Sequence, residues 1–116
     1  MRADAHQRRA QQLEHTIASV GDPTNDPDQV PGLIELYWSA AFHWIAYGCQ
    51  GKHGKHKENH TQLARYLKDL SEIDIGAAWD RLENKRQGAL YAYADGLKDV
   101  EDARADWQEV RAWALS

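Results

Sequence analysis

The chain has 116 residues, a length that suits one domain with its own hydrophobic core. Charged residues make up 28% of it and the formal net charge is −4, which argues against a broadly basic nucleic-acid surface but allows a local basic patch. The single cysteine, Cys49, cannot form an internal disulfide, so we expect a buried structural thiol and a reducing compartment. The N-terminal stretch lacks the apolar segment of a signal peptide, which favours a cytoplasmic location.

The first predicted element is a helix over residues 3–20. Apolar residues recur every three or four positions there and make one stripe. We expect His6 and His15 to lie on the surface. A glycine and a proline, Gly21 and Pro23, end the helix, and all three prolines of the chain fall in the loop predicted over residues 21–31.

The most apolar stretch is Leu33–Tyr47, which predicts a buried central helix ending near Gly48. Its clearly polar residues, Glu35, Ser39 and His43, are spaced four apart and would form one narrow seam facing a partner element or a ligand. The stretch is too short and too often interrupted by polar residues to span a bilayer, so we expect no membrane association.

Beyond the central helix the sequence predicts a basic loop and three further helices. The loop, residues 51–60, carries lysines and histidines, and Asn59 with Gln62 predicts a capping box for the helix after it. Ser71 with Asp74 predicts a second such start. The expected helices cover residues 60–70, 72–95 and 99–114, with Gly96 ending the second of them. No segment shows strand alternation, so the sequence predicts one all-α domain over residues 1–116, an up-and-down bundle of about five helices.

Arg86 is the most informative single residue. It falls on the core-facing stripe of its helix, between Leu82 and Ala89, where a guanidinium needs a partner. One hypothesis is an ion pair with Glu35 that fixes the register of two helices. The other is an anion site in which the planar fork of Arg86 holds a phosphate. Tyr93 would lie on nearly the same face of the helix, with Tyr91 rotated off it.

The histidines are the second group of candidates. His53, His56 and His60 would share one face of a helix and could then bind a metal, but the glycines among them favour a solvated basic loop. A loop that attracts phosphate through Lys55 and His56 is the next alternative. His43 on the central helix is either a core histidine satisfied by a hydrogen bond or a general base. We expect neither a metal nor another cofactor.

The large aromatic residues raise the possibility of association. They are numerous for so small a bundle, and a patch of them exposed on a monomer would mark an interface. The alternative is that all of them fit inside one core. The residues concerned are Tyr37, Trp38, Trp44, Trp79, Trp107 and Trp113.

Three segments give the chain a family resemblance. LYWSAAFHWIAYGC (Leu36–Cys49) is similar to an aromatic-Ser-x-x-Phe-His helix, GKHGKHKENH (residues 51–60) to a basic, histidine-containing turn, and RQGALY (Arg86–Tyr91) to an Arg-x-x-Ala-Asp-Tyr motif. In this order they resemble the HEPN domain, a small helical domain named for its occurrence in higher eukaryotes and prokaryotes and for nucleotide binding.

The resemblance implies a bacterial bundle of four or five helices, commonly a homodimer, that works beside a minimal nucleotidyltransferase as a toxin–antitoxin pair. Active members of the family are metal-independent endoribonucleases in which four to six residues separate an arginine from the histidine that follows it. Arg86 matches that arginine. The histidine is not matched, because Tyr91, Ala92 and Tyr93 stand there, and Leu90 replaces the motif aspartate.

These observations lead to three hypotheses. The first is a non-catalytic or weakly active module that binds a nucleotide, RNA or a partner protein through Arg86, His43, Tyr91 and the basic loop. The second is an endoribonuclease toxin in which His43 replaces the missing motif histidine and works with Arg86. The third is a purely structural dimerisation module in which Arg86 only pairs with Glu35.

Overall fold

The computed structural model describes residues 1–20, 27–90 and 96–116. Within these ranges it contains α-helices and short 3-10 turns and no strand, which confirms the predicted all-α bundle of five helices. Tyr91 and Tyr93, two of the candidate site residues, lie outside the described residues. The elements are α1 (Ala3–Val20), η1 (Pro27–Gln29), α2 (Val30–His53), η2 (His60–Gln62), α3 (Leu63–Asp69), α4 (Ile73–Leu90) and α5 (Leu97–Leu115).

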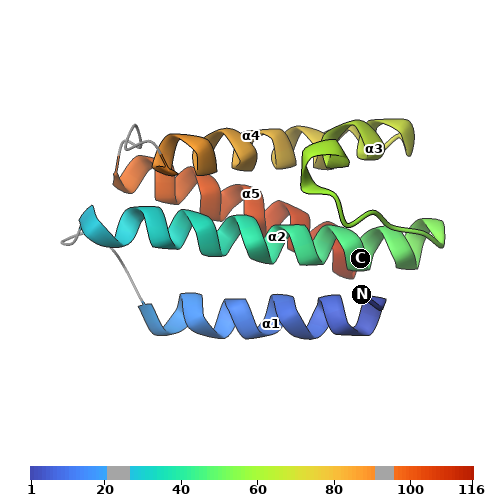
Figure 1. Ribbon diagram of the computed structural model, residues 1–116, viewed down its shortest axis with the longest axis horizontal. Coiled ribbons are helices and arrows are strands. Elements are labelled where there is room, and N and C mark those ends of the chain that lie inside the picture. The colour runs from blue at the N-terminus through green and yellow to red at the C-terminus, as the bar shows by residue number, and fades with distance from the viewer. Residues whose placement is uncertain (21–26, 91–95) are drawn as a thin grey trace.

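Helix α2 is the centre of the bundle, as its apolar sequence predicts. It packs against α1 on one side and against α4 and α5 on the other, while the short α3 packs on α4 (Figure 1). The two chain ends lie at the same end of the bundle. The side chains of α2 in the core are fully or almost fully buried; they include Leu33, Ile34, Tyr37, Ala40, Ala41, Trp44 and Ile45. No helix of the described residues has both the length and the apolar character needed to cross a membrane.

The predicted end of the central helix near Gly48 is wrong. Helix α2 continues to His53, and Gly54 ends it with a left-handed φ of 72° while its N–H bonds to the Gln50 carbonyl. Gly48 is needed for a different reason: a Cβ atom there would lie 2.4 Å from Cζ3 of Trp113 on α5. The glycine lets an indole ring lie directly against the backbone of α2, so it serves helix packing.

Replacing Gly48 by alanine is expected to destabilise the fold by about 1–3 kcal/mol, since the new methyl group would force the Trp113 ring to move. Gly51→Ala is the matched control in the same helix, because a Cβ at Gly51 meets nothing within 4 Å. That variant should be neutral or slightly stabilising, as alanine favours a helix over glycine. Urea unfolding of both variants measures the difference, and equal stabilities would contradict the packing role.

The other helix boundaries follow local chemistry that the sequence predicted only in part. The Asn59 side chain accepts a hydrogen bond from the Thr61 N–H at 3.0 Å, so Asn59 is confirmed as an N-cap, although of the turn η2 before α3, and the part of Gln62 in the predicted box stays a prediction. Ser71 is not the cap of the next helix. It has a φ of 63°, and the carbonyl of Glu72 instead accepts the Gly76 N–H at the start of α4. The predicted end of α4 at residue 95 lies outside the described residues, and Gly96 directly precedes α5.

The prediction that some large aromatics are exposed is wrong. Tyr37, Trp44 and Trp79 are buried, and Trp38, Trp107 and Trp113 are partly buried against the core. Each indole N–H also has an acceptor: Trp38 donates to Glu83, Trp44 and Trp107 both donate to Glu14, Trp113 donates to Glu72, and Trp79 donates to the His60 carbonyl. All six aromatics therefore fit into one core, and they provide no interface patch.

Cys49 has the environment expected of a structural thiol. Its side chain is 1% exposed, and burial, with the nearby Glu72 carboxylate, raises the pKa of the thiol to about 12. A thiol that remains protonated at neutral pH is a poor nucleophile. Cys49 therefore belongs to the packing of α2.

Candidate functional site

The polar seam of the central helix does not converge on one site. Glu35 is exposed and contacts α4, Ser39 is partly buried, and His43 contacts α1. Eight residues of helix separate Glu35 from His43, which is about 12 Å along the axis. The predicted pocket containing both His43 and Arg86 therefore does not form within this chain.

Arg86 makes the ion pair that its sequence position predicts. Its Nε lies 2.9 Å from Oε2 of Glu35, and its guanidinium stacks 4.0 Å from the centre of the Trp38 ring. The Arg86 side chain is 29% exposed, so it lies at the edge of the core. Since Glu35 is half exposed, the pair contributes about 1 kcal/mol or less. The Glu35 carboxylate occupies one edge of the guanidinium and the Trp38 indole covers one face, so fewer of its N–H donors remain for an anion.

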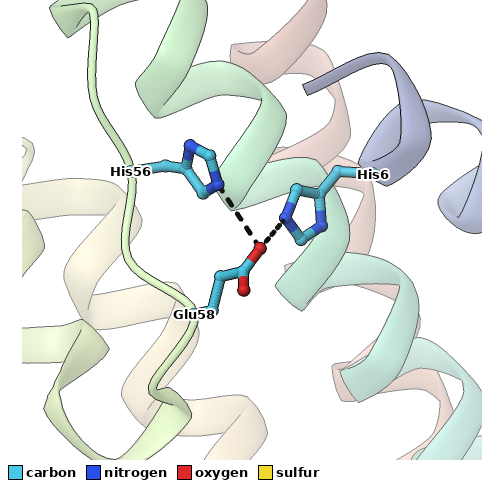
Figure 2. A group of neighbouring side chains, drawn as sticks. All are labelled: His6, His56 and Glu58. Atoms are coloured by element: carbon cyan, nitrogen blue, oxygen red, sulfur yellow. Dashed lines mark hydrogen bonds and ion pairs between the residues drawn. The ribbon is translucent and has the colours of Figure 1, made fainter. Parts of the chain in front are cut away.

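A cluster of histidines joins α1, α2 and the loop after α2. His6, predicted to lie on the surface, is 1% exposed, and this prediction is wrong. The Nδ1 atoms of His6 and His43 share a hydrogen bond of 2.8 Å, and Nε2 of His6 donates to Oε1 of Glu58 at 3.0 Å. His56 points its Nε2 at the same carboxylate oxygen, 3.5 Å away (Figure 2).

Burial and charge set the protonation of this cluster. Burial is the main cause that lowers the pKa of His43 to about 4, with the His6 ring and the Arg9 guanidinium adding to the effect. Burial also lowers the pKa of His6, against the opposing effect of its hydrogen bond to Glu58. The N-terminal ammonium, followed by His6, lowers the pKa of Glu58 to about 2. At neutral pH the cluster therefore contains neutral His6 and His43 beside an ionised carboxylate.

His53, His56 and His60, the trio for which metal binding was an alternative to a solvated loop, do not come together in one site. His53 is the last residue of α2 and bonds to Glu72 at 3.0 Å, whereas the His60 ring lies edge-on to Trp38 and near Glu83. The three residues cannot share a helix face because Gly54 ends α2 between them. Of the three, only His56 joins the histidine cluster. Its partners there, His6 and Glu58, were not predicted from the sequence.

A basic groove lies on the other side of the loop. Its volume is about 510 Å³, and it runs between the loop and α3. Lys57 stacks over the Tyr66 ring at 5.6 Å. Within residues 1–20, 27–90 and 96–116, no ion pair joins the three cations of this groove to a carboxylate. The lining residues are Lys55, Lys57, Gln62, Arg65, Tyr66, Asp69 and Leu70.

A second groove, between α4 and α5, differs in its electrostatics. It measures about 590 Å³, but its cations are already paired. Arg81 bonds to Asp106 at 2.9 Å, and Lys85 pairs with Asp99 and Asp102. This groove is a network of ion pairs that joins the two helices, so it presents little unbalanced charge to a ligand.

The two sites near the loop share one extended segment. Successive side chains of an extended segment point to opposite sides. Lys55 and Lys57 line the basic groove, while His56 and Glu58 enter the histidine cluster. The alternation of lysine with histidine or glutamate over residues 55–58 was visible in the sequence, but its meaning depends on the segment being extended.

Comparisons with protein-family models, with curated protein sequences and with solved structures find no match to this chain. The resemblance to the HEPN domain therefore stays a prediction based on the three sequence motifs.

Proposed function

We propose that the chain is a non-catalytic, HEPN-like helical module that binds the phosphate groups of a nucleotide or of single-stranded RNA in the basic groove. The observation that carries the proposal is the gathering of Lys55, Lys57 and Arg65 around one groove without carboxylate partners among the described residues. The other groove has its cations neutralised by aspartates. Uncompensated cations around a concavity attract anions.

The chemistry of the groove suits phosphate. Arg65 offers a planar fork for two phosphate oxygens, and the lysines add mobile point charges. Asp69, which also lines the groove, and the net charge of −4 oppose anions. Because salt screens the attraction between the three cations and phosphate, binding should be sensitive to salt. If single-stranded RNA neutralises three cations, the logarithm of its binding constant should fall with the logarithm of salt with a slope of about −2.

The partners belong to the proposal through the family resemblance. We propose a cytoplasmic protein that forms a homodimer and acts with a nucleotidyltransferase-like partner in a toxin–antitoxin-type system. The buried thiol of Cys49 suits a reducing compartment. The core aromatics give no support to dimerisation, so this part depends on the sequence motifs alone.

The two alternatives receive less support. In the ribonuclease alternative, His43 would be the general base, but its Nδ1 is bonded to His6 and its pKa of about 4 makes it a weak base. Arg86 contacts Glu35, which lies about 12 Å along α2 from His43, so one phosphate could not contact both Arg86 and His43 within a chain. The Arg86–Glu35 pair favours the structural alternative. That alternative, however, gives the basic groove no role.

A binding titration tests the proposal. ATP and a short single-stranded RNA are titrated into the wild-type chain and into Arg65→Glu, Lys57→Glu, Lys68→Glu and Arg86→Ala at two salt concentrations. Lys68 is the matched control, since it is an exposed lysine of α3 that does not line the groove. We expect Arg65→Glu and Lys57→Glu to weaken binding at least tenfold, while Lys68→Glu and Arg86→Ala change it less than threefold.

The two ligands separate the sources of phosphate. Binding of ATP alone indicates a nucleotide site, and tighter binding of RNA indicates a strand that reaches beyond the groove. Equal weakening by Lys68→Glu and Arg65→Glu would mean unspecific charge attraction and would overturn the groove. Loss of binding in Arg86→Ala alone would move the site to Arg86.

A further inference from the structure

The inner side of the loop has the composition of a metal site. His6 comes from α1, whereas His56 and Glu58 come from the extended segment (Figure 2). One ligand atom from each of these three residues lies within 4.8 Å of the other two. Two imidazole nitrogens and one carboxylate oxygen form a ligand set common for Zn²⁺. This set is independent of the cations that line the basic groove.

Two of the three spacings between the ligand atoms match a coordination sphere. With metal–ligand bonds of about 2.0–2.1 Å, neighbouring ligands of a tetrahedron are about 3.3 Å apart. The Glu58 oxygen is 3.0 Å from Nε2 of His6 and 3.5 Å from Nε2 of His56. These two distances lie on either side of the tetrahedral value. An ion bound to all three atoms would draw the two imidazole nitrogens, which lie within 4.8 Å of each other, toward the same value.

The outer hydrogen bonds also fit. A metal-binding histidine almost always donates its second ring N–H to an acceptor. His56 places its Nδ1 2.8 Å from Oε1 of Gln50, and Nδ1 of His6 lies 2.8 Å from Nδ1 of His43. In both rings, therefore, Nε2 points at Glu58 while Nδ1 is hydrogen-bonded to a residue of α2, Gln50 or His43.

The unliganded arrangement around His56 makes the same point. If Nδ1–H donates to Gln50, the Nε2 atom faces two acceptors, the Glu58 carboxylate and the Met1 carbonyl at 3.1 Å. Two oxygen atoms beside one ring nitrogen make a polar environment that suits a cation. The Met1 ammonium, which lies against Glu58, supplies positive charge at this position.

We propose that His6, His56 and Glu58 bind one divalent transition-metal ion, with Zn²⁺ as the best match to the ligand set. On binding, His6 releases its Nε2 proton to solvent and coordinates through Nε2, while the proton shared with His43 moves to Nδ1 of His6, which then donates to Nδ1 of His43. His43 takes up one proton from solvent on Nε2, so both rings stay neutral, and the Glu58 carboxylate exchanges the Met1 ammonium for the metal. The ion joins α1 to residues 55–58 and stabilises the fold in proportion to the logarithm of its concentration.

Cobalt spectroscopy on the untagged 116-residue chain, freed of metal with EDTA, tests this proposal. Co²⁺ is titrated to about 0.1 mM while the visible absorption of tetrahedral cobalt is followed, and Zn²⁺ is then added as competitor. We expect one Co²⁺ per chain, displaced by one Zn²⁺, and a higher melting temperature with Zn²⁺ than with EDTA.

The variants show which residues bind the metal. His56→Gln and Glu58→Gln should weaken cobalt binding at least tenfold, as both lie on the loop and leave the core unchanged. His15→Gln, an exposed histidine of α1, is the control and should bind as the wild type does. Absence of stoichiometric binding would overturn the proposal, as would equal weakening in His15→Gln and His56→Gln. Phosphate binding can fail or succeed without affecting any of these results.

Discussion

Glu14→Ala is expected to lower the free energy of unfolding by about 3 kcal/mol, although Glu14 lies at the edge of the bundle. Its carboxylate accepts the indole N–H of Trp44 at 2.7 Å and that of Trp107 at 2.8 Å, and it also pairs with Arg111. Trp44 is 0% exposed, so its N–H would lose its partner. An unpaired buried donor costs about 1–3 kcal/mol, and bonds to a charged acceptor are the stronger ones.

Two variants control this measurement by urea unfolding. Glu14→Gln keeps one carbonyl acceptor and should lose roughly half as much stability as Glu14→Ala. Glu101→Ala removes an exposed glutamate of α5 and should change stability by less than about 0.5 kcal/mol. If Glu14→Ala and Glu101→Ala were equally stable, the shared carboxylate would have no structural importance.

The fold is expected to lose stability in mild acid because of His43. Its pKa is about 4 in the folded chain and 6.5 in the unfolded chain, so below pH 6.5 the unfolded state binds a proton that the folded state does not. The contribution is complete above pH 6.5 and is lost as pH falls toward 4, on the order of 3 kcal/mol in total. His6 acts in the same direction. Glu58 acts only below its unfolded pKa of 4.5, so it does not affect the upper part of this window.

The pH dependence is measured by urea unfolding in EDTA between pH 7 and 5. His43→Gln cannot titrate but can still hydrogen-bond to His6, so its stability should fall less steeply with acid than that of the wild type. His15→Gln removes an exposed histidine and should keep the wild-type slope. A His43→Gln slope equal to that of the wild type would show that the buried ring is not the cause.

The helices were predictable because each carries an apolar stripe with a local start or stop signal. Helix α2 was also recognisable as the centre, since a helix that is apolar nearly all round must be covered on most sides. Its C-terminal end was not predictable from Gly48. In a sequence, a glycine usually indicates the end of a helix. Here it allows the close approach of Trp113 of α5, which is 65 residues away in the chain and could not be recognised as a neighbour.

The candidate site was predictable only in part. The position of a guanidinium on a core-facing stripe predicted either a pair with Glu35 or an anion site, and the structure contains the pair. The burial of His6 was not predictable, since α1 by itself gives no reason to cover that ring. His43 of α2 and Glu58 of the loop come against it only when the helices pack.

The sequence by itself therefore determined the helical class of this protein and the central position of α2, because these depend on spacing within one helix, and it offered the Arg86–Glu35 pair only as one of two hypotheses for Arg86. The tertiary structure decided which glutamates accept the indole N–H groups, that Lys55, Lys57 and Arg65 share a groove, and that His6, His56 and Glu58 meet. The physical reason is that hydrogen bonds and ion pairs reach only about 3–4 Å. Residues far apart in the chain reach that distance only through the packing of the whole bundle.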